Sequence, residues 1–194
     1  MKFYVPLKGE IRLGEYNLQN ISNKIWRKHC GVVMQNSYIF SDTIAHNIAV
    51  AEEVPDMKKL NYALNVANIL EFVESLPLGT NTKIGAEGAG LSQGQQQRIL
   101  IARAVYKDPE FIFFDEATNS LDANNEKVIM YNLHEFFEGK TVIVAAHRLS
   151  TVKNADQIVV LDNGKIKEVG THQELTEMEG EYFELVRNQL ELGG

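Results

Sequence analysis

The chain has 194 residues, of which 44% are apolar and 23% charged, so it can bury a core as one good-sized domain or two small lobes. Its formal net charge of −7 and the lack of any basic run argue against nucleic acid as the main partner. The single cysteine, Cys30, excludes an internal disulfide, and no apolar run approaches the roughly 20 residues that cross a bilayer. We therefore expect a soluble chain, or a soluble piece of a larger protein, in which Cys30 is a small packed side chain.

The first twenty residues predict sheet. Residues 9–13 alternate polar and apolar side chains, and the glycine-containing stretch 14–17 predicts a turn. A short apolar strand is expected at residues 31–34, where Gln35 ends it, and Trp26 lies in the polar stretch before it.

Residues 41–77 change to a helical pattern. Asp42 is placed to cap a short helix that runs to residue 49, and Asp56 to cap a longer one, which Pro77 closes. The apolar residues of the longer helix recur at helical spacing, and they are Leu60, Ala63, Leu64, Ala67 and Leu70. We interpret this stretch as a helical lobe inserted between sheet elements.

A glycine-rich stretch, residues 79–90, leads to the sequence LSQGQ at residues 91–95 and then to a predicted helix at 99–106. The glycines do not form the dinucleotide-binding pattern G-x-G-x-x-G, and no strong strand precedes them. Ser92 is placed to be the N-cap of the helix. A helix start presents unpaired N–H groups and a partial positive charge, which suit an anion, although Ser92 could also serve only as a cap.

The sequence FIFFDEAT at residues 111–118 predicts the central strand. Four apolar residues indicate a buried strand of a parallel sheet, and Asp115 and Glu116 then lie at its carboxyl end, where such sheets place their ligands. One carboxylate could hold a metal while the other handles a proton. The alternative interpretation is a strand followed by an acidic helix N-cap.

The rest of the chain continues the α/β pattern. Residues 122–139 predict a helix that Gly139 ends, with Ile129, Leu133 and Phe136 facing inward, and residues 141–145 predict a second buried strand that leads to His147.

The last forty residues predict a hairpin and two helices. Asn163 and Gly164 form a strong two-residue turn signal between apolar strands. Thr171 and Glu174 form a capping box for one helix, and residues 182–192 form another, whose apolar residues are Phe183, Leu185, Val186 and Leu190.

Three of these elements stand in a fixed order, namely LSQGQ, the strand that ends in two acids and the strand that leads to a histidine. The order resembles the ATP-binding cassette (ABC) ATPase family over essentially the whole chain. Gln35 matches the Q-loop glutamine, and the signature motif is matched by Ser92, Gln93, Gly94 and Gln95. Residues 111–115 match Walker B, and Glu116 matches the glutamate that follows it. Residues 120–122 match the D-loop, and His147 matches the switch histidine. Gln93 stands where the commonest signature has glycine.

The resemblance implies an α/β fold, a partial P-loop NTPase with a mainly parallel sheet and an inserted helical subdomain. It also divides the chain into three parts. Residues 1–40 are the remaining N-terminal sheet part of the ATPase core with the Q-loop, and residues 41–105 are the helical subdomain that ends in the signature helix. Residues 106–194 are the rest of the ATPase core, with Walker B, the D-loop, the switch histidine and the C-terminal helices.

The resemblance also implies a set of catalytic and metal-binding roles with ATP and Mg²⁺ as cofactors. Asp115 and Gln35 would hold Mg²⁺, Glu116 would polarise the attacking water, and His147 would touch the γ-phosphate. Such a positioned base contributes roughly 10²–10⁴-fold to a rate.

The ATP-binding residues implied by the family are Gln35, Ser92, Gln93, Gly94, Gln95 and Asp122. Those of the signature would bind ATP held by a second nucleotide-binding domain in a head-to-tail dimer, with Asp122 at the dimer interface. Further partners would be the transmembrane domains of a transporter, at the cytoplasmic face of a bacterial cell membrane.

Finer features resemble the exporter branch of the family. Residues 40–44 resemble exporter nucleotide-binding domains, and so do residues 82–85, although Lys83 and Ala86 depart from the usual acidic pattern. The C-terminal residues 180–193 resemble bacterial exporters of bacteriocin-like peptides that carry a peptidase domain. We therefore expect ATP hydrolysis coupled to export of a peptide or another substrate.

The 194 residues contain no phosphate-binding loop G-x-x-x-x-G-K-[ST], also called Walker A. The nearest match, residues 139–141, precedes a strand instead of a helix. We expect the chain to be the C-terminal part of a nucleotide-binding domain that by itself binds ATP weakly and hydrolyses it negligibly. The alternative function is a non-catalytic dimerisation or interaction module.

Overall fold

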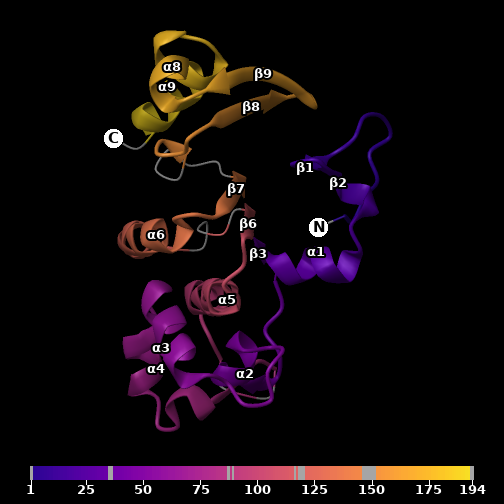
Figure 1. The fold of residues 1–194 in the computed structure, drawn as a ribbon. Coiled ribbons are helices and arrows are strands. Elements are labelled where there is room, and N and C mark those ends of the chain that lie inside the picture. The colour runs from indigo at the N-terminus through magenta and orange to yellow at the C-terminus, as the bar shows by residue number, and fades with distance from the viewer. Residues whose placement is uncertain are drawn as a thin grey trace. The chain divides into compact units, whose positions relative to one another are not determined.

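The computed structural model describes residues 2–34, 37–86, 88, 90–115, 117, 121–145 and 152–192. The chain divides into two compact units, Met1–Ile143 and Val144–Gly194 (Figure 1). Within the ranges described, no helix is both long enough and apolar enough to cross a membrane.

One sheet of the described residues has the strand order β3-β6-β7. Its strands are β3 (Cys30–Met34), β6 (Phe111–Asp115) and β7 (Thr141–Ala145). Strands β3 and β6 run parallel. Alternate side chains of both are buried, among them Val33 and Ile112 with no exposed surface. The predicted parallel strand at residues 111–114 is therefore confirmed.

The second predicted strand, β7, forms but is not buried as expected. Its side chains alternate between exposed and half-buried, and 54% of Ile143 is accessible. The reason lies in its position, because β7 is the last strand of the sheet among the described residues. An apolar run is therefore not sufficient to bury a strand.

The first thirty residues contain β1 (Arg12–Leu13), β2 (Tyr16–Asn17), η1 (Leu18–Asn20) and α1 (Asn23–His29). Strands β1 and β2 pair antiparallel around the predicted turn. Sequence reasoning missed α1, which Ser22 caps and which places Trp26 against Phe111 with ring centroids 5.0 Å apart.

The predicted helical stretch, residues 41–77, contains β4 (Asp42–Thr43), α2 (Ile44–Ile48), α3 (Met57–Val66) and α4 (Leu70–Ser75). It is followed by η2 (Gly79–Asn81), β5 (Lys83–Ile84) and α5 (Gln93–Lys107). Asp56 caps α3 as predicted, accepting from the amides of Lys58 and Lys59. The cap of α2 is Thr43 instead of Asp42, because the Thr43 hydroxyl accepts from the His46 amide at 3.1 Å, whereas the Asp42 carboxylate accepts from the Thr43 amide. Helices α2 and α3 both pack on α5 (Figure 1).

Helix α6 (Ala123–Phe137) follows the sheet strand β6 and begins after its N-cap, Asp122. The three side chains predicted to face inward, Ile129, Leu133 and Phe136, are at most 6% exposed. Gly139 ends the helix with a positive φ of 73°.

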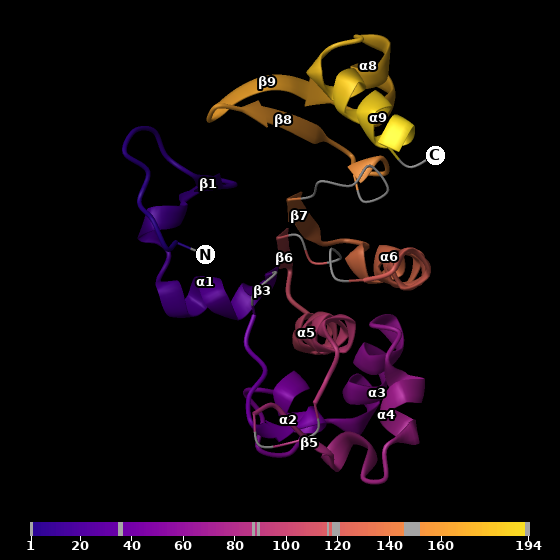
Figure 2. The same cartoon turned by 180° about the vertical axis from the view of Figure 1, so that it is seen from behind.

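In residues 152–192, the second unit combines a hairpin with helices that pack on it. Strands β8 (Ile158–Asp162) and β9 (Lys165–Gly170) pair antiparallel, and Asn163 and Gly164 both have positive φ, as a two-residue hairpin turn requires. Helices α8 (His172–Glu177) and α9 (Glu181–Leu192) pack on β9 (Figure 2). The predicted capping box of α8 is present, and the unit's core is formed by Ile158, Val160, Leu175 and Tyr182.

Candidate functional site

The signature segment, residues 92–95, forms the N-terminus of α5. The Ser92 hydroxyl oxygen accepts from the Gln95 amide at 3.2 Å, and the Gln95 side-chain oxygen accepts from the Ser92 amide at 2.9 Å. This reciprocal capping box starts the helix at Gln93, well before the predicted residue 99. The signature residues therefore belong to the helix itself.

The capping box decides which groups at this helix start are available to a ligand. The amides of Gln93 and Gly94 are the first two of the helix and have no acceptor within it. The Ser92 hydroxyl accepts one hydrogen bond and still carries a proton to donate. Ser92 and Gln93 are exposed. Two amides, one hydroxyl and the positive end of a 15-residue helix can bind a phosphate oxygen.

Asp115 is the last residue of β6 and is exposed, opposite Met34 at the end of β3. Both strands thus end at the same edge of the sheet, as the prediction of a ligand edge requires. The other residues predicted there, Gln35, Glu116 and His147, lie outside the described residues.

A single carboxylate is a sufficient protein contribution to a Mg²⁺ site. The described ranges contain no group of three or more His, Cys, Asp or Glu side chains that could hold a metal. Magnesium is commonly bound through one or two carboxylates together with substrate phosphates and waters. Asp115, exposed at the end of its strand, fits that role.

Asp122, the predicted D-loop aspartate, is the N-cap of α6. One carboxylate oxygen accepts from the amides of Asn124 and Asn125 at 3.1 and 3.0 Å, and the other accepts from the Asn125 side chain at 2.6 Å. These hydrogen bonds, above all the one from the Asn125 side chain, lower the pKa of Asp122. Asp122 therefore remains ionised at neutral pH.

Arg98, six residues after Ser92, connects the signature helix to neighbouring segments. Its guanidinium donates to the backbone carbonyl of Asn68 at 2.8 Å, and the Asn68 side chain donates to Asn125 at 2.9 Å. Burial lowers the pKa of Arg98, and the nearby Asp122 opposes this shift. No role for Arg98, Asn68 or Asn125 was predicted from the sequence. The signal in the sequence was a charged residue at the point where the polar run 93–97 of α5 meets the apolar run 99–102.

A second polar contact fixes the segment that follows Gln35. Asn47 of α2 is fully buried, accepts from the Phe40 amide at 2.8 Å and donates to the carbonyls of Phe40 and Thr43 at 2.9 and 3.0 Å. Arg103 of α5 donates to the Asn47 carbonyl at 2.7 Å and lies 5.2 Å from the centroid of the Phe40 ring. The signature helix thus holds residues 38–43 from its far end.

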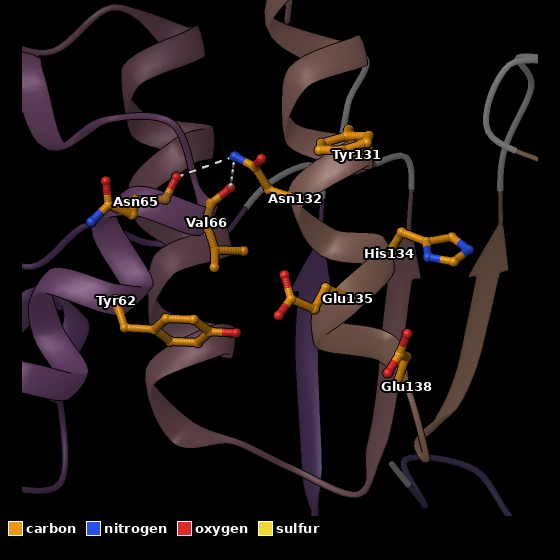
Figure 3. Close-up of a pocket in the computed structure, with 8 residues that line it drawn as sticks. All are labelled: Tyr62, Asn65, Val66, Tyr131, Asn132, His134, Glu135 and Glu138. Carbon is orange, nitrogen blue, oxygen red and sulfur yellow. Dashed lines mark hydrogen bonds between the residues drawn. The ribbon is translucent and has the colours of Figure 1, made fainter.

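A pocket of about 400 Å³ lies between α3 and α6 (Figure 3). Its lining residues are Tyr62, Asn65, Val66, Tyr131, Asn132, His134, Glu135 and Glu138. Tyr62 and Glu135 extend toward each other across it (Figure 3). None of the predicted site residues lines this pocket, so the chemistry predicted from the sequence lies elsewhere.

Residues 1–119 match the family model described as "ABC transporter". The chain belongs to the ABC transporter family. It is 46% identical over 189 residues to the ATP-dependent lipid A-core flippase of Alkalilimnicola ehrlichii. This alignment covers 97% of the chain and 32% of the flippase. The chain is 44% identical over 174 residues to the alpha-hemolysin translocation ATP-binding protein HlyB of Escherichia coli, covering 90% of this chain and 25% of HlyB.

Solved structures agree with this assignment. The structure of a bacterial Atm1-family ABC exporter with ATP bound superposes with a TM-score of 0.92 at 35% identity, over 97% of this chain and 33% of the exporter. The ABC chain is therefore a nucleotide-binding domain of exporter type, and the predicted α/β ABC ATPase fold is confirmed. The chain spans about a third or less of the length of these three relatives.

The individual site residues of this ABC domain remain predictions. The structure places residues 92–95, Asp115 and Asp122 at a helix start, a strand end and a helix cap, respectively. The three-part division of the chain at residues 40 and 105 also remains a prediction.

Proposed function

We propose that this chain is the ATP-binding and ATP-hydrolysing part of an exporter, and that hydrolysis is coupled to transport across a membrane. The observation that carries the proposal is the capped start of α5. There the capping box leaves the amides of Gln93 and Gly94 and the Ser92 hydroxyl proton available to bind an anion. Ser92 and Gly94 bind the γ-phosphate of ATP held by a second nucleotide-binding domain, so the active assembly is a head-to-tail dimer with Asp122 at its interface.

A second set of residues hydrolyses the ATP that the chain itself holds. Phosphoryl transfer depends mostly on positioning and charge stabilisation, and bound Mg²⁺ supplies positive charge to the phosphates. Asp115 holds that ion together with Gln35. Glu116 accepts a proton from the attacking water and orients it, and His147 contacts the γ-phosphate.

Relatives support the proposed membrane partners and cargo. HlyB and the RTX-I protein of Actinobacillus pleuropneumoniae are named for toxin translocation, and the C-terminal residues 180–193 resemble peptide exporters. We propose a peptide cargo and a location at the cytoplasmic face of the bacterial cell membrane, beside transmembrane domains. A relative of similar identity is named a lipid flippase, so the cargo has to be tested directly.

A non-catalytic interaction module is the second candidate. It is supported by the same observation, because the exposed start of α5 can serve the ATP of another domain whether or not this chain hydrolyses ATP itself. In this case the signature segment still serves the ATP of another domain, while Asp115 has no ATP of its own to act on.

Calorimetric titration of Mg-ATP separates the two candidates. We compare the 194-residue chain with a chimera in which it replaces the matching part of the bacterial Atm1-family exporter, whose own upstream residues are retained. We expect weak binding and negligible turnover by the chain alone. The chimera should hydrolyse ATP, and Glu116→Gln should abolish this activity. A folded chimera that binds ATP without hydrolysing it would favour the interaction module. Robust turnover by the chain alone, lost in Glu116→Gln, would refute our account of the missing loop.

A further inference from the structure

Asn68 lies between α3 and α4, and its backbone and its side chain make separate contacts. Asn68 has a φ of +51°, in the left-handed region. Its amide donates to the Asn65 carbonyl and the Ile69 amide to the Leu64 carbonyl, which is the Schellman arrangement that ends a helix. Glycine satisfies this backbone at least as well as asparagine. The asparagine side chain is therefore not needed to end α3.

Asn68 instead connects the start of α6, which Asp122 caps, to the signature helix α5. Its side chain donates to the Asn125 side-chain oxygen at 2.9 Å, and the Asn125 side chain in turn donates to Asp122 at 2.6 Å. On the other side, the Asn68 carbonyl accepts from Arg98 at 2.8 Å. Three hydrogen bonds of good length thus lead from the D-loop aspartate to the signature helix.

Arg98 and Asn125 also contact each other directly, but at a longer distance than the hydrogen bonds through Asn68. The Arg98 guanidinium lies 3.5 Å from the Asn125 side-chain oxygen, at the limit of a hydrogen bond. Its Nε lies 3.4 Å from the Gly94 carbonyl. The connection through Asn68 is therefore the stronger of the two routes.

We propose that Asn68 is a positioning residue which, through Asn125 and Arg98, makes the placement of the signature segment depend on the D-loop aspartate Asp122. The inference rests on the proposed function, in which Asp122 lies at a dimer interface and the signature binds the partner's ATP. A displacement of the D-loop in the dimer is then passed to Ser92 and Gly94 of the same chain. Asn68 contacts no nucleotide in this proposal.

A separate contact allows this idea to be tested without unfolding the protein. Asn132 of α6 donates to the carbonyls of Asn65 and Val66 at 3.3 Å each, so it holds the end of α3 independently of Asn68 (Figure 3). Asn68→Gly keeps the left-handed backbone and removes only the side chain. Asn124→Ala is a matched control for Asn125→Ala, because Asn124 is the exposed neighbour on the same helix.

Hydrogen exchange in the 194-residue chain provides the first test. The reporter is the Gln96 amide, which donates to the Ser92 carbonyl at 2.9 Å. We expect Asn125→Ala to speed its exchange roughly two- to tenfold, the effect of one lost hydrogen bond. In the Asn68→Gly background, Asn125→Ala should add nothing further. An effect that is equally large in that background, or equally large for Asn124→Ala, would overturn the proposal.

The chimeric exporter provides the second test. Asn68→Gly and Asn125→Ala should each lower kcat for ATP hydrolysis roughly two- to tenfold, while the dissociation constant for Mg-ATP stays unchanged, because the chain's own ATP contacts neither residue. Asn124→Ala should leave both constants unchanged. A rise in the dissociation constant without a change in kcat would contradict a positioning role. If the unmodified chimera hydrolyses no ATP, the proposed function fails, and the exchange experiment then decides the coupling alone.

Discussion

Asn47→Ala tests whether one buried amide holds the segment after Gln35 to the signature helix. The substitution leaves the Phe40 amide without its 2.8 Å acceptor and removes two donors at 2.9 and 3.0 Å. An unsatisfied buried donor costs about 1–3 kcal/mol, and each lost hydrogen bond about 0.5–1.5 kcal/mol. The better helix propensity of alanine returns about 0.5 kcal/mol. We therefore expect a loss of about 3 kcal/mol in the free energy of unfolding.

Trp26 provides the assay for this prediction. It is the single tryptophan of the chain, it is 5% exposed, and it lies in the same compact unit as Asn47. Its fluorescence during urea denaturation therefore reports this unit. With a slope of about 2 kcal/mol/M, the midpoint should fall by about 1.5 M.

Asn61→Ala is the matched control for this experiment, because Asn61 is exposed on α3 and undergoes the same chemical change. It should leave the midpoint unchanged or raise it slightly. If Asn47→Ala shifts the midpoint no more than Asn61→Ala does, then the Asn47 hydrogen bonds do not hold the segment, and the reasoning is wrong.

Four further results are expected. Ser92→Ala should lower the free energy of unfolding by about 1 kcal/mol in urea titrations, because it removes the N-cap of α5, and Ser92→Thr should restore most of it. Folding lowers the pKa of Asp122, so the ionised carboxylate stabilises the folded state above its unfolded pKa, and this stabilisation is lost as the pH falls through its folded pKa. The urea midpoint should therefore fall less between about pH 5 and pH 3 in Asp122→Asn than in the unmodified chain. Gly31→Ala should cost about 1–3 kcal/mol in the same assay, because a Cβ there would lie 2.6 Å from Cγ of Pro109. The chain should self-associate in analytical ultracentrifugation, and Ile143→Lys should reduce this, since Ile143 is 54% exposed on β7; a monomer at all concentrations would contradict it.

The features that the sequence predicted correctly are local ones. The caps Asp56 and Ser92, the turn at Asn163 and Gly164, and the end of α6 at Gly139 all form as expected. Each depends on side chains within about four residues of the backbone group they serve, so the pattern itself contains the cause. The signature residues 92–95 and Asp115 are local features too, because they lie at a helix start and at a strand end, while their roles stay predictions.

The incorrect predictions share a physical cause, because each depends on parts of the chain that are distant in sequence. Trp26 was placed in a polar stretch, but it forms the buried contact of α1 with Phe111, more than eighty residues away in the chain. Residues 141–145 were expected to be buried because they are apolar, yet burial of a strand depends on what covers its faces. Neither fact is recorded in the periodicity of the segment concerned.

The sequence by itself determined the family and most of the elements, and it supplied the residues to which the proposed chemistry is assigned. Only the tertiary structure decided how those residues are held. The hydrogen bond between Asn68 and Asn125 joins residues 57 positions apart, and the one between Arg103 and Asn47 spans 56. A polar side chain far along the chain acquires its partner only when the helices that carry both have packed. Its role is therefore a property of the fold and cannot be inferred from the local pattern.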